Sequence, residues 1–108
     1  MRAPSTSEFA LVRGRLKRSV TKPDGSSYIH WCTRAVFRTV AQAIEAAGDA
    51  GATGREIADA EGLSFTQAHT ALAFLVERGC VEVVGRRNFP ASDVLLEDAM
   101  VEFEALAA

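Results

Sequence analysis

This sequence has few of the residues that mark several large protein classes. It contains two cysteines, three prolines, one tryptophan and one tyrosine among 108 residues. Two cysteines are too few for a disulfide framework, and Cys32 and Cys80 each sit in an apolar stretch, which predicts reduced, buried thiols. No run approaches the roughly 20 consecutive apolar residues of a membrane-spanning helix, and MRAPSTSEF lacks the layout of a secretory signal. We therefore expect a soluble, cytoplasmic protein.

Basic residues are slightly fewer than acidic ones, 12 against 14, and they are unevenly distributed. The formal net charge is −2. Residues 1–40 hold eight basic and two acidic residues, a net charge of +6, whereas residues 41–84 carry −5 and residues 85–108 carry −3. Because salt screens charges over about 10 Å, a local basic surface attracts a polyanion even on an acidic chain. The distribution permits nucleic-acid binding without establishing it.

Catalytic and metal-binding patterns are missing from the sequence. There is no G-x-S-x-G, no phosphate-binding loop, and no CxxC or HxxxH spacing. The pair His30-x-Cys32 is the nearest approach to a metal-binding pattern, and no second pair supports it. We predict that the protein is not an enzyme and that it holds no metal and no cofactor.

The N-terminal segment is read as a tail followed by a basic extended region. Residues 1–8 show no apolar period and are predicted to be a flexible tail. In VRGRLKRSV, alternation predicts one strand with a basic face formed by Arg13, Arg15 and Lys17. KPDG then predicts a turn, and SSYIHW a second extended run. Residues 9–31 are therefore interpreted as a basic hairpin or, alternatively, as a basic extended arm.

The middle of the chain has the period of helices. Apolar residues recur at helical spacing from Thr33 until Gly48 ends the run. Thr53-Gly-Arg-Glu56 is a capping box, which predicts the start of a short helix that Gly62 stops.

A second capped helix follows after a short turn. Ser64-Phe-Thr-Gln67 is another capping box, and the helix it starts is predicted to run to Arg78 and to end at Gly79. Two capped helices joined by a glycine-containing turn predict a helix-turn-helix.

The C-terminal region is predicted to form a hairpin and a last helix. CVEVV and FPAS are read as edge strands around a GRRN turn, because Pro90 is unfavourable in a central strand. The helix is predicted to begin at a Ser92 or Asp93 cap. It places Leu96, Met100, Phe103 and Ala107 on one face. We predict that this face forms a homodimer interface; the alternative is that the helix folds back onto its own domain.

This order of elements resembles the winged helix-turn-helix superfamily, in particular the MarR-like and ArsR-like bacterial regulators. The resemblance rests on TGREIADAEGLSFTQAHTALAFLVERGCVEVVGRRNF, about a third of the chain. It implies a mainly α fold with a small β-hairpin wing, an N-terminal basic arm or hairpin and an extra C-terminal helix. The expected units are the tail (1–8), the basic segment (9–31), the winged helix-turn-helix domain (32–92) and the C-terminal helix (93–108).

The resemblance further implies binding of duplex DNA. In such regulators the solvent face of the second helix of the motif enters the major groove, and the wing contacts the backbone. Hydroxyl, amide and imidazole groups on that face suit base edges and phosphates, and arginines suit phosphates. Each residue also has a structural explanation, as part of a cap or as a solvated polar side chain. The predicted DNA-binding set is Arg13, Arg15, Lys17, Arg18, Arg55, Thr66, Gln67, His69, Thr70, Arg86 and Arg87.

The sequence departs from these regulators on the face meant to read DNA. Ala73 and Phe74 stand where such proteins often carry Lys or Arg, and Phe65 adds a large apolar group. Exposed together, Phe65 and Phe74 predict a protein-binding patch; alternatively, Phe74 packs beneath the N-terminal hairpin or the C-terminal helix. We expect a DNA-binding transcriptional regulator. The alternative is a winged-helix protein-interaction module without DNA binding of its own.

Overall fold

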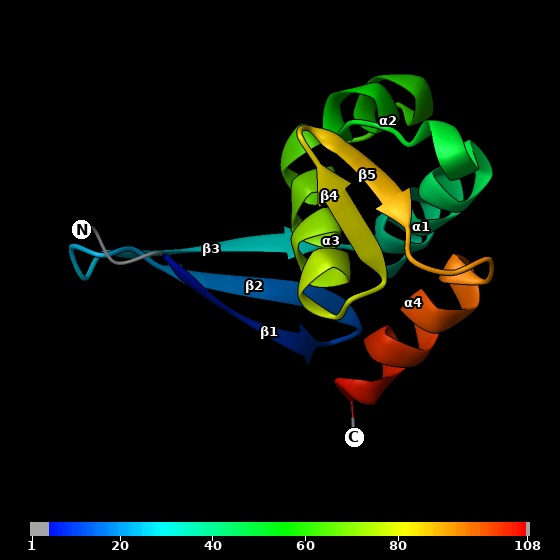
Figure 1. Ribbon diagram of the computed structural model, residues 1–108. Helices are drawn as coiled ribbons and strands as arrows, with labels where there is room; N and C mark the ends of the chain where they lie inside the picture. The colour runs from blue at the N-terminus through cyan, green and yellow to red at the C-terminus, as the bar shows by residue number, and fades with distance from the viewer. Residues whose placement is uncertain (1–4, 108) are drawn as a thin grey trace.

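The structure, a computed structural model, describes residues 5–107, which form helices and two antiparallel sheets (Figure 1). No helix in this range is both long and apolar enough to cross a membrane. The elements in chain order are β1 (Thr6–Val12), β2 (Arg15–Thr21), β3 (Ser27–Cys32), α1 (Arg34–Ala47), the 3₁₀ turn η1 (Gly48–Ala50), α2 (Gly54–Glu61), α3 (Phe65–Glu77), β4 (Val81–Val84), β5 (Arg87–Pro90) and α4 (Leu95–Ala105).

The prediction of a mainly α fold is wrong. The protein is α+β, with 48% helix and 28% strand, and it begins with a sheet in the order β1-β2-β3. The prediction failed inside VRGRLKRSV, which was read as one strand. Arg13 and Gly14 take φ angles of 52° and 78° and turn the chain between β1 and β2. Two positive φ values match the twist of a hairpin, and Arg is an unusual residue there, so the turn was not recognised.

The predicted tail is also partly wrong, because β1 begins inside it. Residues 6–8 pair with residues 19–21 of β2. Residues 1–4 of that tail lie outside the described residues. The second hairpin, β2-β3, turns at KPDG, where the Gly25 amide donates to the Lys22 carbonyl. The basic extended arm is therefore replaced by a three-stranded sheet, which Figure 1 shows extending away from the helices.

The core lies where the inner face of this sheet meets α1, α3 and α4. Phe74 is fully buried between Phe9 of β1 and Phe37 of α1, with ring centroids 5.2 and 5.7 Å away at steep interplanar angles. Phe37 in turn contacts Phe103 of α4 at 4.8 Å. Aromatic pairs in such arrangements add to the free energy gained by burying their surface. These four rings connect β1 of the sheet with α3, α1 and α4.

α2 and α3 start after the predicted capping residues Thr53 and Ser64, and α1 starts after a further cap, Thr33. The Thr33 hydroxyl accepts the amide of Val36 at the start of α1, and Thr53 and Glu56 form the complete capping box of α2. At α3 only half of the predicted box forms. The Ser64 hydroxyl accepts the Gln67 amide, but the Gln67 side-chain oxygen accepts the Thr33 amide instead, at 3.0 Å. Gln67 therefore joins the start of α3 to the start of α1.

The predicted apolar face of the C-terminal helix is displaced by one residue along most of its length. α4 begins at Leu95, later than the predicted cap, and its buried stripe is Leu95, Ala99 and Phe103. Leu96 and Met100 are half-buried beside this stripe. The helix folds back onto its own domain, because Phe103 fills the core beside α1. The prediction that Phe103 forms a dimer interface is wrong.

Candidate functional site

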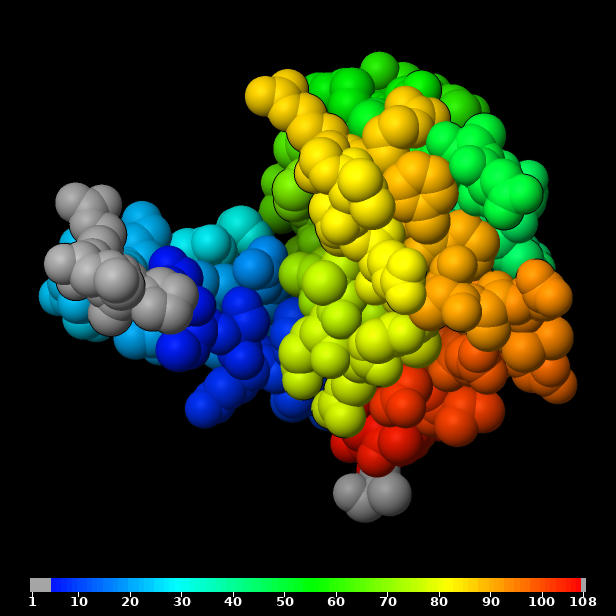
Figure 2. Space-filling view, viewed as in Figure 1, coloured from blue at the N-terminus to red at the C-terminus, as the bar shows by residue number. Residues whose placement is uncertain are grey.

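A groove of about 850 Å³ lies over the exposed face of α3. One side is β2 and the other is the β4–β5 hairpin, which we call the wing. Figure 2 shows the sheet and the tip of the wing projecting on the same side of the body, with α3 in the hollow between them. The lining residues are Arg18, Thr53, Gly54, Arg55, Phe65, His69, Leu72, Ala73, Val76, Val83, Arg86 and Asn88.

The lining of this groove is positively charged. It contains three arginines and one histidine but no acidic residue, although acidic residues outnumber basic ones by 14 to 12 in the chain. Among residues 5–107, no ion pair involves Arg18, Arg55 or Arg86. Their charges are therefore not neutralised by the protein and are available to an anion.

The arginines come from three separate elements, and local contacts orient two of them. Arg18 of β2 donates from Nε to the Ser7 hydroxyl at 3.1 Å. The Arg55 guanidinium, at the start of α2, lies 4.3 Å from the ring centroid of Phe65. Such cation–π contacts hold a guanidinium over a ring without neutralising it. The groove is therefore basic on the sheet side, at α2 and at the wing turn.

Two aromatic side chains lie along the floor of the groove. The rings of Phe65 and His69 are 4.5 Å apart and tilted by 49°. Burial lowers the pKa of His69 below its usual value of 6.5, and the charge of Arg18 lowers it further. His69 is therefore neutral at pH 7.

The predicted basic face of the N-terminal segment is divided by the sheet. Arg15 and Lys17 lie on the side away from the core, where their charged groups are 4.6 and 5.9 Å from the Trp31 ring centroid. Arg13 is in the β1–β2 turn. Only Arg18, which alternates with them along β2, reaches the groove. The expectation that the odd-numbered residues lie beside α3 is wrong, because the even-numbered face of β2 packs on the core.

The polar residues predicted along α3 do not form one reading surface. Thr70 is fully buried, and its hydroxyl donates to the Thr66 carbonyl at 2.8 Å, so the prediction that it contacts DNA is wrong. Gln67 is bonded to Thr33, and Thr66 is exposed but outside the groove lining. His69 is the one member of this group in the groove. The sheet packs against α3 and covers the side of the helix that carries Thr70, which the helix sequence alone does not reveal.

The predicted patch of Phe65 and Phe74 does not form. Phe74 lies in the core, whereas Phe65 is 39% exposed. The alternative that Phe74 packs beneath the N-terminal hairpin is the one the structure supports, since its ring meets Phe9 of β1.

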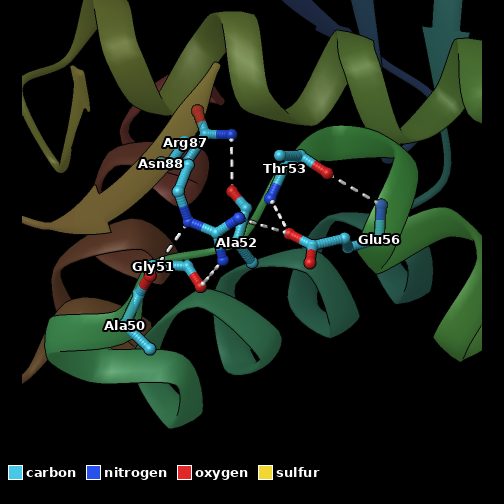
Figure 3. A network of polar contacts seen from close by, with 7 residues as sticks. All are labelled: Ala50, Gly51, Ala52, Thr53, Glu56, Arg87 and Asn88. Carbon is cyan, nitrogen blue, oxygen red and sulfur yellow. Dashed lines mark hydrogen bonds and ion pairs between the residues drawn. The ribbon is translucent and has the colours of Figure 1, made fainter. Parts of the chain in front are cut away.

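The adjacent wing arginines have different roles. Arg86 is in the turn and lines the groove, whereas Arg87 begins β5 and faces η1 and α2 (Figure 3). Arg87 donates to the carbonyls of Ala50 and Gly51 at 3.0 and 2.9 Å and pairs with Glu56 at 3.1 Å. The guanidinium of Arg87 is therefore bound within the protein, and its contact with phosphate stays a prediction.

Figure 3 shows that this network fixes the wing to the start of α2. Asn88 is buried and forms three hydrogen bonds with the backbone of Ala52, one of them from its side-chain amide. The Thr53 amide donates to Glu56 and lowers the pKa of that carboxyl, and the charge of Arg87 lowers it further. The sequence did not predict the contact between Asn88 and Ala52, because GRRN was read only as a turn.

A second groove, of about 740 Å³, lies between α1 and α4. Leu96 and Met100 line it with the exposed Val94 and Val101, and its charged residues are Arg38, Glu45, Glu97 and Glu104. Val101 is 66% exposed and was not among the predicted interface residues.

Neither cysteine is placed for thiol chemistry. Burial raises the pKa of Cys32 to about 12, and Cys80 is buried as well. Within residues 5–107, no three His, Cys, Asp or Glu side chains are grouped so that they could hold a metal ion.

The comparisons with known proteins identify no relative. No protein-family model, curated protein or solved structure matches the chain. Membership of the winged helix-turn-helix superfamily therefore stays a prediction. Any function must be argued from the groove itself.

Proposed function

We propose that the protein binds nucleic acid in the groove over α3, with Arg18, Arg55 and Arg86 contacting phosphates. The observation that carries this proposal is the acid-free, arginine-rich lining on a chain with a net negative charge. A concave surface of one sign concentrates its field and raises the local concentration of a polyanion. Arginine suits phosphate because its planar group donates several hydrogen bonds at once.

The arrangement also supports an extended ligand. The three arginines come from the sheet, from α2 and from the wing, so they surround the floor formed by α3. A chain of phosphates offers one charged group to each of the three arginines, which a ligand with a single charge does not. Regulation of transcription, which the family resemblance implies, stays a prediction.

The test is the salt dependence of oligonucleotide binding. The triple variant R18Q/R55Q/R86Q is compared with R13Q/R15Q/K17Q, which removes the same charge from the β1–β2 turn and the outer face of the sheet. Binding is followed by fluorescence anisotropy at several salt concentrations. Each lost phosphate contact reduces the slope of log K against log salt by about 0.7–0.9. We expect a decrease of about 2 or more for the groove variant and little change for its control.

Two results contradict the proposal. One is no binding of any oligonucleotide at low salt, where the electrostatic attraction is strongest. The other is an equal loss of slope in both triple variants, which would mean that the groove has no special role.

A second candidate function is association of two copies through the α1–α4 groove. It is favoured by the exposed Val94 and Val101 beside Leu96 and Met100. Sedimentation at micromolar concentration tests this. We expect a dimer that Val101→Glu converts to a monomer, and a wild-type monomer would contradict it.

A further inference from the structure

The exposed face of α3 is recessed between two flanking elements. Arg18 of β2 stands on one side of the groove, and Val83 and Arg86 of the wing stand on the other. A DNA major groove is about 12 Å wide, and an α-helix with its side chains is about 10–12 Å across. A helix must therefore project beyond the elements that flank it in the protein to enter the major groove. Because α3 does not, a duplex would meet the sheet and the wing before its base edges reached the helix.

Apart from the three arginines, the groove has few free groups for reading base edges. The Thr53 hydroxyl accepts the Glu56 amide, and the Asn88 side-chain amide donates to Ala52. Among residues 5–107, the His69 side chain forms no hydrogen bond, so its ring nitrogens are free for a base. Discrimination between base pairs requires matched donors and acceptors, which this floor does not provide.

The floor offers stacking and apolar contact instead. Phe65 is 39% exposed beside His69, with the Arg55 guanidinium over its ring. The surface continues over Leu72, Ala73 and Val76. In a duplex, the flat faces of the bases are covered by neighbouring pairs. Unpaired bases expose those faces and stack on aromatic side chains with little regard to sequence.

We infer that the groove binds a single strand of nucleic acid, with its bases against Phe65 and His69 and its phosphates at the three groove arginines. This inference rests on the proposed function and names the form of nucleic acid that the same site takes. A volume of about 850 Å³ suits a few nucleotides of one strand.

The experiment compares one labelled strand of about 15 mixed nucleotides, alone and annealed to its complement, in anisotropy titrations at low salt. We expect the full-length protein to bind the single strand about tenfold more tightly than the duplex. Phe65→Ala is expected to weaken single-strand binding about fivefold or more and duplex binding less, since a duplex loses only the orientation of Arg55, whereas Phe65→Tyr keeps the ring and the affinity. Tyr28→Ala removes an exposed aromatic residue outside the groove and serves as the control.

The outcomes separate the inference from the proposed function. Duplex binding as tight as that of the strand, still lost in R18Q/R55Q/R86Q, overturns the inference and leaves nucleic-acid binding in place. No binding of either probe overturns both. Tighter binding of the strand with no effect of Phe65→Ala also overturns the inference, because the bases then lie elsewhere. Circular dichroism checks that each variant is folded, which the partial exposure of Phe65 favours.

Discussion

Arg87 of the wing and Glu56 of α2 form an ion pair with a nitrogen–oxygen distance of 3.1 Å. The same Glu56 oxygen accepts the Thr53 amide at 2.8 Å, so the pair is an extension of the α2 capping box. Arg87 also donates to two carbonyls in the segment before α2. The wing is thereby fixed against the helical body, and Arg86 is held at the groove.

Substitution of the two wing arginines should therefore separate stability from binding. Arg87→Ala removes the hydrogen bonds to Ala50 and Gly51 and is expected to lower the free energy of unfolding by about 1 kcal/mol, since the side chain is partly exposed. Arg86→Ala is expected to change it by less than about 0.5 kcal/mol but to weaken oligonucleotide binding. Urea unfolding and anisotropy measure the two quantities. Equal effects of both variants on unfolding would contradict these distinct roles.

Gly51 packs against Phe89 of the wing. Its φ is +66°, and a Cβ atom there would lie 2.6 Å from the Phe89 ring. Gly51→Ala is expected to destabilise the protein by about 1–3 kcal/mol beyond the backbone strain, because Phe89 must move. Gly48→Ala is the control, since its backbone (φ 54°, ψ −128°), like that of Gly51, lies outside the left-handed helical region, and nothing lies within 4 Å of it. Equal losses in urea unfolding would show that the Phe89 contact is not important.

The helices could be predicted from the sequence because their signals are local. Thr33, Thr53 and Ser64 each cap a backbone amide three residues away, so the pattern and the bond lie in the same short segment. The turn at Arg13 and Gly14 is local too, but its residue types are shared with ordinary strands. One missed turn was enough to change the predicted fold class.

The groove could not be predicted in this way, because its parts come together only in the folded chain. Arg18, Arg55 and Arg86 belong to three elements, and each was named in the sequence for a different reason. Thr70 was assigned to the solvent side, although packing of the sheet buries it. The side of α3 that stays open depends on β2 and β3, which are distant in sequence and carry no signal within the helix itself.

Nucleic-acid binding should strengthen at low pH through His69. The folded protein holds the pKa of this residue below its usual 6.5, so the ring is neutral at neutral pH. Phosphates bound at the groove arginines bring negative charge into the groove that His69 lines and favour its protonated ring, so the pKa rises in the complex and binding takes up a proton. Affinity is then expected to increase about threefold as the pH falls from about 7.5 to about 6. Uptake of one complete proton on binding would raise the affinity tenfold for each pH unit, so the expected effect is smaller.

His69→Gln should abolish this pH dependence, whereas His30→Gln, on β3 and outside the groove, should keep it. The charged groups that face His69 in the groove are arginines, which do not titrate in this range. Anisotropy titrations at several pH values give the measurement. If the affinity of His69→Gln still depended on pH, another group would be taking up the proton.

Phe103 is expected to contribute to the stability of the single chain and not to an interface. It is 1% exposed and contacts Phe37, whereas Val101 on the same helix is 66% exposed. Phe103→Ala should lower the free energy of unfolding by about 3–5 kcal/mol through lost burial and the cavity left behind. Val101→Ala should change it by less than about 0.5 kcal/mol. Urea unfolding at two protein concentrations measures both, and a loss for Phe103→Ala that vanishes on dilution would instead place this ring between two copies.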